Sequence, residues 1–210
     1  MKPFLERVHE LPFLGLGIST EYEAGLQKGA LNPLELHSQH PEYLRYLEIG
    51  VELAKGLDKD ALAWCASGRP TTYHFLDINL NEEEDLSEDW IRGICQLRDT
   101  MKPAWMCGDL GLWHFGQRDR GQMLLLPPIL TEEAAIDYAK GITNLRGITG
   151  LEVLPENPPG QVYLGDLGLL EFFQILCEKA DTGMLLDCAH LAIYQALEGK
   201  SPLEGLKGFP

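Results

Sequence analysis

The stretch Thr71-Thr-Tyr-His-Phe-Leu-Asp-Ile78 is an apolar, strand-like run that leads directly into a helix-like segment. The acidic residues from Asn81 to Asp85 open this segment, which continues through Leu97. Acidic side chains in a first turn suit the positive end of the helix dipole. A strand followed by a helix is the βα unit from which parallel sheets are built.

Working outward, five further strand-like runs each lead into a helix-like segment, which gives six βα units in all. We expect these strands at residues 13–18, 43–49, 104–107, 150–154 and 183–187. We expect one helix to begin at Glu21, a second to end near Gly68 and a third to begin after an N-cap at Thr131. A fourth should span 167–179, and the last should reach Leu197.

Six βα units predict a single α/β domain of the TIM-barrel type over residues 1–210, incomplete because a closed barrel needs eight units. An open doubly wound sheet would also accept six units. The first predicted strand contains Gly15 and Gly17, but no third glycine opens a helix after it. A dinucleotide-binding site is therefore poorly supported.

Composition and charge restrict the partners of the chain. Its 210 residues are 45% hydrophobic and 23% charged, as in globular proteins. The net charge of −15 disfavours nucleic acid and anionic membranes, which both need clustered Lys and Arg. Charges interrupt the apolar residues at the N-terminus, no segment is long enough to span a membrane, and the five cysteines form no CxxC pair. We therefore expect a cytoplasmic protein.

Residues that can carry chemistry stand where the predicted strands end, which is where parallel α/β folds place functional side chains. A single acidic residue at such a position is commonly an N-cap of the next helix, whereas several together indicate a metal site. The candidates are Glu48, His74, Asp77, Asp109, Glu152 or Glu156 with Asn157, and Asp187 with His190.

The segment Leu185-Leu-Asp-Cys-Ala-His190 is the strongest local signal. Asp187 ends a strand and His190 follows on the first helical turn, so both side chains can reach one ion, for which iron, manganese or zinc is suitable. The alternative is an aspartate cap beside a histidine. His74 lies inside an apolar strand, and strand alternation places Thr72 on its side and Phe75 on the other. It is either a ligand or a hydrogen-bonded core residue.

Two loops complete the candidate site. Cys107-Gly-Asp-Leu-Gly-Leu-Trp-His-Phe-Gly116 carries Trp113 and His114, which either roof a substrate pocket or pack onto the barrel rim. In Leu154-Pro-Glu-Asn-Pro-Pro-Gly160, Glu156 is a candidate ligand and Asn157 is a candidate to orient it or the substrate, although the prolines also suit a rigid turn. Cys107 and Cys188 lie nearby but lack a paired base, so we assign no nucleophile.

Several segments together resemble the multinuclear non-haem iron-dependent oxidases, a family once described as a domain of unknown function that includes the methanobactin-maturation oxidase. The resemblance spans nearly the whole chain. Its most distinctive part is Leu125-Leu-Pro-Pro-Ile-Leu-Thr-Glu-Glu-Ala134. The other parts are Leu14–Ile18, Tyr73–Leu80, Pro103–Met106, Glu156-Asn157 and Leu185–His190.

The resemblance implies a TIM barrel similar to xylose isomerase, two or three iron ions, and oxidation by O₂ of ribosomally made peptides that a partner protein presents. His74 matches the family's strand-three histidine ligand, and Asp187 its strand-six aspartate. Glu156, or alternatively Glu152, matches the glutamate of its Glu-Asn pair. His190 falls where the family has Asn, Asp or His, and Asp109 replaces a histidine ligand.

We therefore expect an iron-dependent peptide oxidase whose metal ligands are His74, Asp109, Glu156, Asp187 and His190. We expect substrate contacts from Glu48, Trp113, His114 and Asn157. The alternatives are a sugar isomerase or hydrolase that uses zinc or manganese, and a degenerate, non-enzymatic binding protein. Because strands seven and eight are missing, we expect either a truncated barrel or a partial one that covers its open edges by self-association as a homo-oligomer.

Overall fold

The computed structural model describes residues 2–20, 32–116, 125–207 and 209, and its main feature there is a parallel sheet of five strands. The strands lie in the order β1-β2-β3-β4-β6, and every neighbouring pair is parallel. Each new strand lies beside the preceding one, so the described sheet has no switch point at which a doubly wound fold reverses its order. The sheet is part of a barrel wall. Its strands are Gly17–Thr20, Tyr46–Val51, Thr71–Phe75, Met106–Asp109 and Val153–Glu156.

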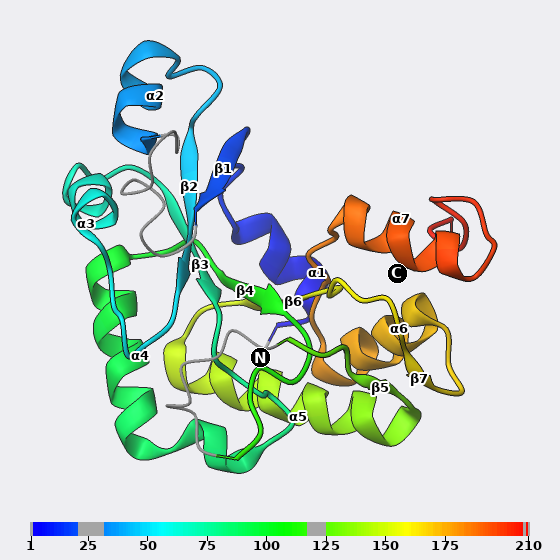
Figure 1. Cartoon of the computed structure of the whole chain (residues 1–210). Coiled ribbons are helices and arrows are strands. Elements are labelled where there is room, and N and C mark those ends of the chain that lie inside the picture. The colour runs from blue at the N-terminus through cyan, green and yellow to red at the C-terminus, as the bar shows by residue number, and fades with distance from the viewer. Residues whose placement is uncertain (1, 21–31, 117–124, 208, 210) are drawn as a thin grey trace.

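Helices cover the outer face of this sheet, as Figure 1 shows. Helix α4 packs on β3, and α5 packs on both β6 and α6. Two short strands, β5 (Ile129–Leu130) and β7 (Leu164–Gly165), pair with each other outside the main sheet. The helices are α1 (Phe4–Arg7), α2 (Pro33–Gln39), α3 (Lys59–Ala66), α4 (Glu88–Met101), α5 (Glu132–Thr149), α6 (Leu169–Ala180) and α7 (Cys188–Leu197), with the 3₁₀ turns η1 (Val8–Glu10) and η3 (Glu83–Leu86).

The main core lies between the sheet and the helices, and strand alternation separates it from the inner face. The Phe75 ring is fully buried on the helix-facing side. A Cβ at Gly108, on the adjacent strand β4, would stand 2.5 Å from that ring, so only glycine fits there. His74, the neighbour of Phe75, therefore faces the barrel interior, as the sequence predicted.

The first predicted strand differs most at its start. It begins at Gly17 rather than at residue 13, because Gly15 adopts a φ of 81° that interrupts an extended chain. Phe13 is 90% exposed and belongs to no strand. The four following predicted strands are confirmed, with three of them shifted two or three residues toward the C-terminus. The helix predicted from Glu21 begins outside the described residues.

The sixth predicted strand, residues 183–187, is wrong as a strand. Its only bridge in the described structure joins Leu185 to Glu156, and Leu185 N donates to Pro155 O at 3.0 Å. Beyond this bridge the Asn157 side chain takes the place of a strand ladder. Its Nδ2 donates to Asp187 O and its Oδ1 accepts from Asp187 N, both at 2.8 Å. The segment thus follows the edge of the sheet without forming a regular strand.

Helix boundaries follow the expected capping chemistry with one correction. The acidic residues after β3 form the 3₁₀ turn η3, and α4 begins only at Glu88 and ends at Met101, before Lys102 with a φ of 49°. Thr131 caps α5 as predicted, since its Oγ1 accepts from Ala134 N at 3.3 Å. Helix α7 ends at Leu197, also as predicted.

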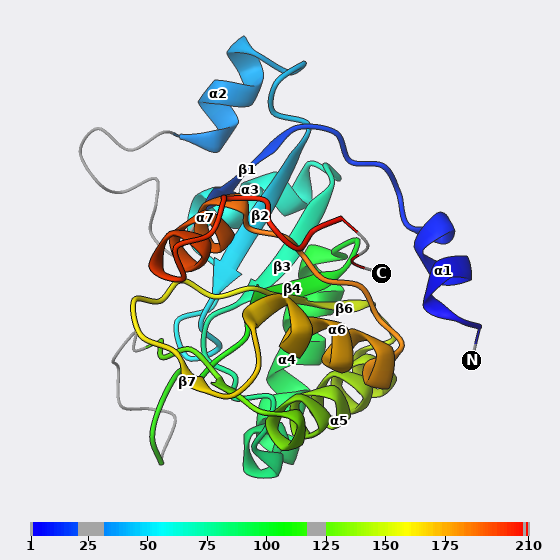
Figure 2. The same ribbon diagram turned by 90° about the vertical axis from the view of Figure 1, so that its right-hand side faces the viewer.

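The N-terminal segment is fastened to the end of the sheet opposite to α7, which Figure 2 shows. Arg7 Nε donates to Glu152 Oε1 at 2.5 Å, just before β6, and Arg7 Nη1 donates to Asp181 Oδ2 at 2.8 Å. The Arg7 and Glu152 side chains are nearly buried. None of the helices formed by the described residues combines the length and the hydrophobicity that a membrane span requires.

Candidate metal centre

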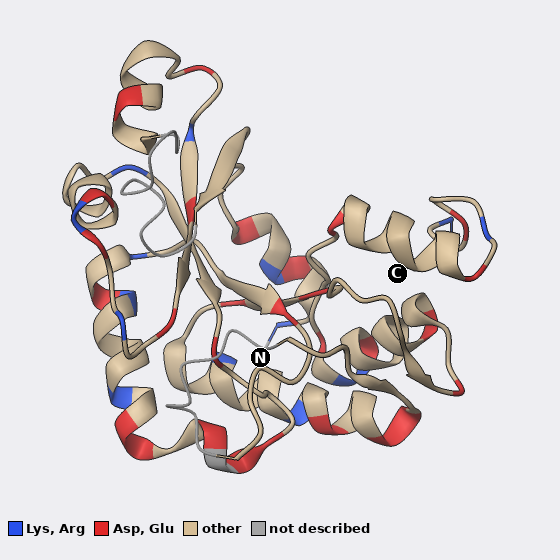
Figure 3. Cartoon of the chain, viewed as in Figure 1, with Lys and Arg blue, Asp and Glu red and all other residues tan. Residues whose placement is uncertain are grey.

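A cavity of about 390 Å³ lies at the C-terminal ends of the sheet strands. Figure 3 shows acidic positions on the strands of the sheet as well as on the outer helices. The cavity collects seven of the nine predicted site residues, from four strands and the segments that follow them. They are Glu48, His74, Asp109, Trp113, Glu156, Asp187 and His190.

The first group of ligand atoms belongs to His74, Asp109 and Glu156, all of which are buried. Asp109 and Glu156 are register partners on β4 and β6, so their side chains leave the sheet on the same face. His74 Nε2 lies 3.1 Å from Glu156 Oε2. Burial lowers the pKa of His74, but its hydrogen bond to Glu156 and the nearby carboxylates outweigh burial and leave this pKa above its usual value.

The second group contains Glu156 again, with Asp187 and His190. Asp187 Oδ1 accepts from His190 N at 2.7 Å and caps α7, while Oδ2 lies 3.7 Å from His190 Nε2. Asp187 is therefore both the cap and a potential ligand, and the two readings do not compete. His190 Nδ1 lies 2.9 Å from Asn157 O, a contact that makes Nδ1 the donor and leaves the lone pair of Nε2 for an ion.

Asp109 lies in surroundings that favour a bound cation. Its Oδ1 is buried without a hydrogen-bond partner among the described residues, and the His190 Nδ1 nitrogen stands 3.5 Å away from it. Burial, followed by the negative charge of Glu156, raises the pKa of Asp109 to about 7. A buried polar atom without a partner costs stability, and a cation between Asp109 and its neighbours would remove that cost.

Glu48 lines the cavity, and its carboxylate contacts the buried thiol of Cys107. Glu48 Oε2 accepts from Thr72 Oγ1 at 3.3 Å and lies 3.3 Å from Cys107 Sγ. Burial, followed by the charges of Glu48 and Glu156, raises the pKa of the Cys107 thiol well above its usual value. Cys107 therefore remains a neutral thiol, and the structure gives it no nucleophilic character.

The sequence left open whether Glu152 or Glu156 is the metal ligand. The two residues are separated by the length of β6. Glu152 stands before the strand and pairs with Arg7 on the far side of the molecule, whereas Glu156 ends the strand in the cavity. Asp77, another strand-end candidate, accepts from Leu53 N at 2.9 Å and does not line the cavity.

Two of the predicted substrate contacts are placed differently by the structure. The Asn157 side chain is fully buried and holds the main chain of Asp187, so it positions a neighbour. Trp113 lines the cavity, and its Nε1 donates to Asp109 O at 3.1 Å. His114 does not line the cavity but lies in a separate group with Glu82 and Asp85.

Several residues of the cavity wall were not predicted individually as site residues. Ser19, Gly50, Leu76, Leu125 and Pro159 complete the cavity wall. Their residue types are common at strand ends and in loops, and only the fold brings them together. Asn79 had a weak signal as a polar residue in an apolar run. It holds the loop after β4, accepting from Trp113 N at 2.6 Å and donating to His114 O at 2.9 Å.

Comparisons with known proteins concern the fold and the family of this chain. A search of curated proteins gives no match. Among solved structures, the chain is similar to a D-psicose 3-epimerase crystallised in the presence of D-fructose, with 12% sequence identity and a TM-score of 0.51. The match covers 83% of this chain and 64% of the epimerase, and at this identity it shows the fold alone.

The family comparison covers most of the sequence. The model described as RiPP precursor modification enzyme MbnB/TglH/ChrH matches residues 24–210. RiPPs are ribosomally made peptides that are modified after translation. The matched range contains every residue of the cavity except Ser19. The chain thus belongs to the family of RiPP precursor modification enzymes.

Proposed function

We propose that this protein is an iron-dependent oxidase that modifies a ribosomally made precursor peptide. The observation that carries the proposal is the convergence of His74, Asp109, Glu156, Asp187 and His190 on one cavity in a chain of this family. Imidazole together with carboxylate is a donor set that suits iron in proteins. The buried Asp109 Oδ1, which has no hydrogen-bond partner in the described part of the chain, fits a bound cation.

The shared position of Glu156 supports more than one ion. Glu156 belongs to both groups of ligand atoms, so its carboxylate can face an ion on either side. His74 and Asp109 would hold the first ion, and Asp187 and His190 the second. Paired ions that share a carboxylate are a common way to place two metals close together. Iron, when bound, supplies the redox chemistry by which O₂ oxidises an organic substrate.

Residues in and beside the cavity orient the metal ligands, shield them from water and offer a contact to the peptide. Asn157 fixes the main chain of Asp187, and its carbonyl fixes the ring of His190. Trp113 and Leu125 cover the polar residues with apolar surface and exclude water from them. Glu48 provides a carboxylate on the inner wall that can accept a hydrogen bond from a peptide amide. By family resemblance a partner protein presents the peptide, and self-association is a further proposal.

Metal analysis of aerobically purified protein tests this proposal first. We expect iron, at more than one equivalent, and its loss from Asp187→Ala. The protein is then co-expressed with a short cysteine-containing precursor peptide, and the peptide mass is compared with that from co-expression with Asp187→Ala. A mass change that needs the intact site supports a peptide oxidase.

The same donor set would also serve a zinc- or manganese-dependent sugar isomerase or hydrolase. Zinc or manganese in the purified protein, with an unchanged peptide mass, would favour that alternative. Absence of any metal would favour a non-enzymatic binding protein and contradict the proposal.

A further inference from the structure

A second group of metal-ligating side chains lies outside the cavity, where η3 meets the loop that follows β4. Glu82, Asp85 and His114 each offer one ligand atom, and these atoms lie within 4.8 Å of one another. Asp85 is 5% exposed and His114 is 6% exposed. This group shares no residue with the two groups in the cavity.

The hydrogen bonds of His114 point to a cation. Its Nδ1 lies 2.8 Å from Gly116 O, a carbonyl oxygen that can only accept, so Nδ1 carries a proton. The ring's other nitrogen, Nε2, faces Asp85 Oδ2 at 2.8 Å. In a neutral imidazole this would place a lone pair against a carboxylate. Either a second proton, carried by Nε2 or by Asp85, or a metal ion must therefore stand between the two side chains.

The surroundings favour a metal ion. A histidine whose Nδ1–H donates to a main-chain carbonyl has the orientation of a typical metal ligand, with Nε2 directed at the ion. One imidazole and two carboxylates suit zinc, manganese or iron better than magnesium or calcium, which prefer all-oxygen sites. Glu82 is half-buried, so its side chain can move to complete the coordination.

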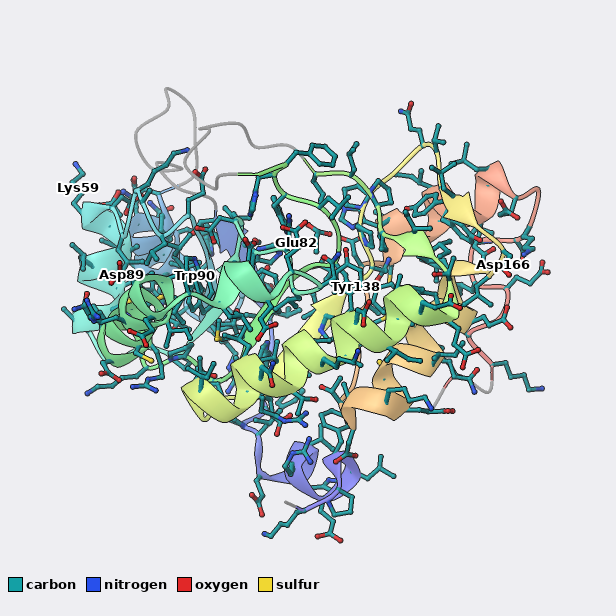
Figure 4. The ribbon with its side chains drawn as sticks, turned by 90° about the horizontal axis from the view of Figure 1, so that it is seen from below. Lys59, Glu82, Asp89, Trp90, Tyr138 and Asp166 are labelled. Atoms are coloured by element: carbon teal, nitrogen blue, oxygen red, sulfur yellow. The ribbon has the colours of Figure 1, made fainter. Side chains whose placement is uncertain are left out.

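Glu82 also connects this group to solvent. It lines a second cavity of about 520 Å³ between η3 and α5, together with Glu83 and Asp137. Figure 4 shows this side of the molecule, with Glu82 labelled close to Tyr138 of α5. Asp137 pairs with Lys140 in this cavity, whereas the carboxylates of Glu82 and Glu83 attract cations toward Glu82.

We propose that Glu82, Asp85 and His114 bind a divalent transition-metal ion that is separate from any ion in the main cavity. The ion fastens the loop after β4 to η3. That loop also carries Trp113, which lines the main cavity, so the second ion holds one wall of the first site in place. The inference stands on its own geometry and does not depend on the oxidase proposal.

Zinc binding to chelator-treated protein tests this inference, with wild type and Glu82→Gln measured by equilibrium dialysis. We expect Glu82→Gln to lose one equivalent of zinc, or to bind it about 10-fold more weakly or worse, because it removes a ligand but keeps the His114–Asp85 contact. Glu83→Gln, a change of the same charge in the same cavity, should bind as wild type does. The variant Glu156→Gln should retain the equivalent that Glu82→Gln loses.

Anomalous scattering at the zinc edge gives a second readout, with a peak expected beside His114 Nε2. His114→Gln should abolish it. If His114→Gln does not fold, Glu82→Gln still decides, since it leaves the buried pair intact. Equal zinc binding by wild type and Glu82→Gln, without a peak at His114, would overturn the proposal and leave a protonated His114 paired with Asp85.

Discussion

Asn157 holds Asp187 by both ends of its side-chain amide, with one hydrogen bond to the main-chain N–H and one to the main-chain carbonyl, each 2.8 Å long. The amide reproduces the pair of bonds that a neighbouring strand would form. Because Asp187 also caps α7, this contact sets where the helix begins and where the His190 ring lies.

Replacement of Asn157 should therefore weaken metal binding without removing a ligand side chain. We expect Asn157→Ala to lower metal affinity by about 10- to 100-fold, which is typical of residues that orient ligands. It should also lower the free energy of unfolding by about 1–3 kcal/mol, because it leaves main-chain groups of Asp187 without partners. Metal titration and chemical denaturation measure the two effects. Gln174→Ala, on the exposed face of α6, is the control, and equal behaviour of both variants would contradict the positioning role.

The two functions of Asp187 can be separated by two substitutions. Asp187→Asn keeps a side-chain oxygen for the cap but removes the charge, so we expect metal loss with nearly wild-type stability of the metal-free protein. Asp187→Ala should lose the metal and about 1 kcal/mol of stability, the usual cost of removing a cap. Thermal unfolding in chelator distinguishes them. Retention of metal by Asp187→Asn would show that the carboxylate acts only as a cap.

The metal-free protein should become less stable, relative to an Asp109→Asn variant, as the pH rises. The pKa of Asp109 is about 7 in the folded state, well above the value of 3.8 for an unperturbed carboxyl. Between these two values the folded state binds a proton that the unfolded state has released, so stability falls with rising pH in this window. We expect the difference in Tm between the variant and wild type to widen by about 5 °C from pH 5 to pH 8. A difference that does not change with pH would contradict the assignment.

Glu152 and Glu156 should respond oppositely to the same chemical change. Glu152→Gln leaves Arg7 buried without its main charge partner, so we expect a loss of about 3 kcal/mol in stability and unchanged metal binding. Glu156→Gln should lose metal while the metal-free protein folds normally. Denaturation and metal analysis on both variants give the comparison. Loss of metal from correctly folded Glu152→Gln would reverse the assignment of the two glutamates.

The sequence predicts the sheet well because each strand is an apolar run followed by a helix with acidic residues in its first turn. It also places Glu48, His74, Asp109, Glu156, Asp187 and His190 at one edge, since parallel strands end on the same side. It does not predict that residues 183–187 form only a bridge, because the hydrogen bonds there come from a side chain. Successive side chains point to opposite faces of the sheet along a strand, but they follow no such rule in a loop.

This difference between strands and loops explains why the direction of the His114 side chain was not predicted. Trp113 and His114 are adjacent in a loop, so the period of two that located His74 gives no guidance to their directions. Asn79 holds both residues, with hydrogen bonds to Trp113 N and His114 O, and turns one ring into the cavity and the other toward Asp85. Contacts between segments far apart in the sequence decide such positions, and local patterns do not contain them.

The bridge at Leu185 has a kinetic consequence. Asp187 and His190 are joined to the sheet by a few hydrogen bonds rather than by a ladder, so the start of α7 can detach by local opening while the five strands stay paired. An ion held on that side would be exchanged at the rate of this opening, which is far faster than global unfolding. Loading and release of the metal would then leave the sheet intact.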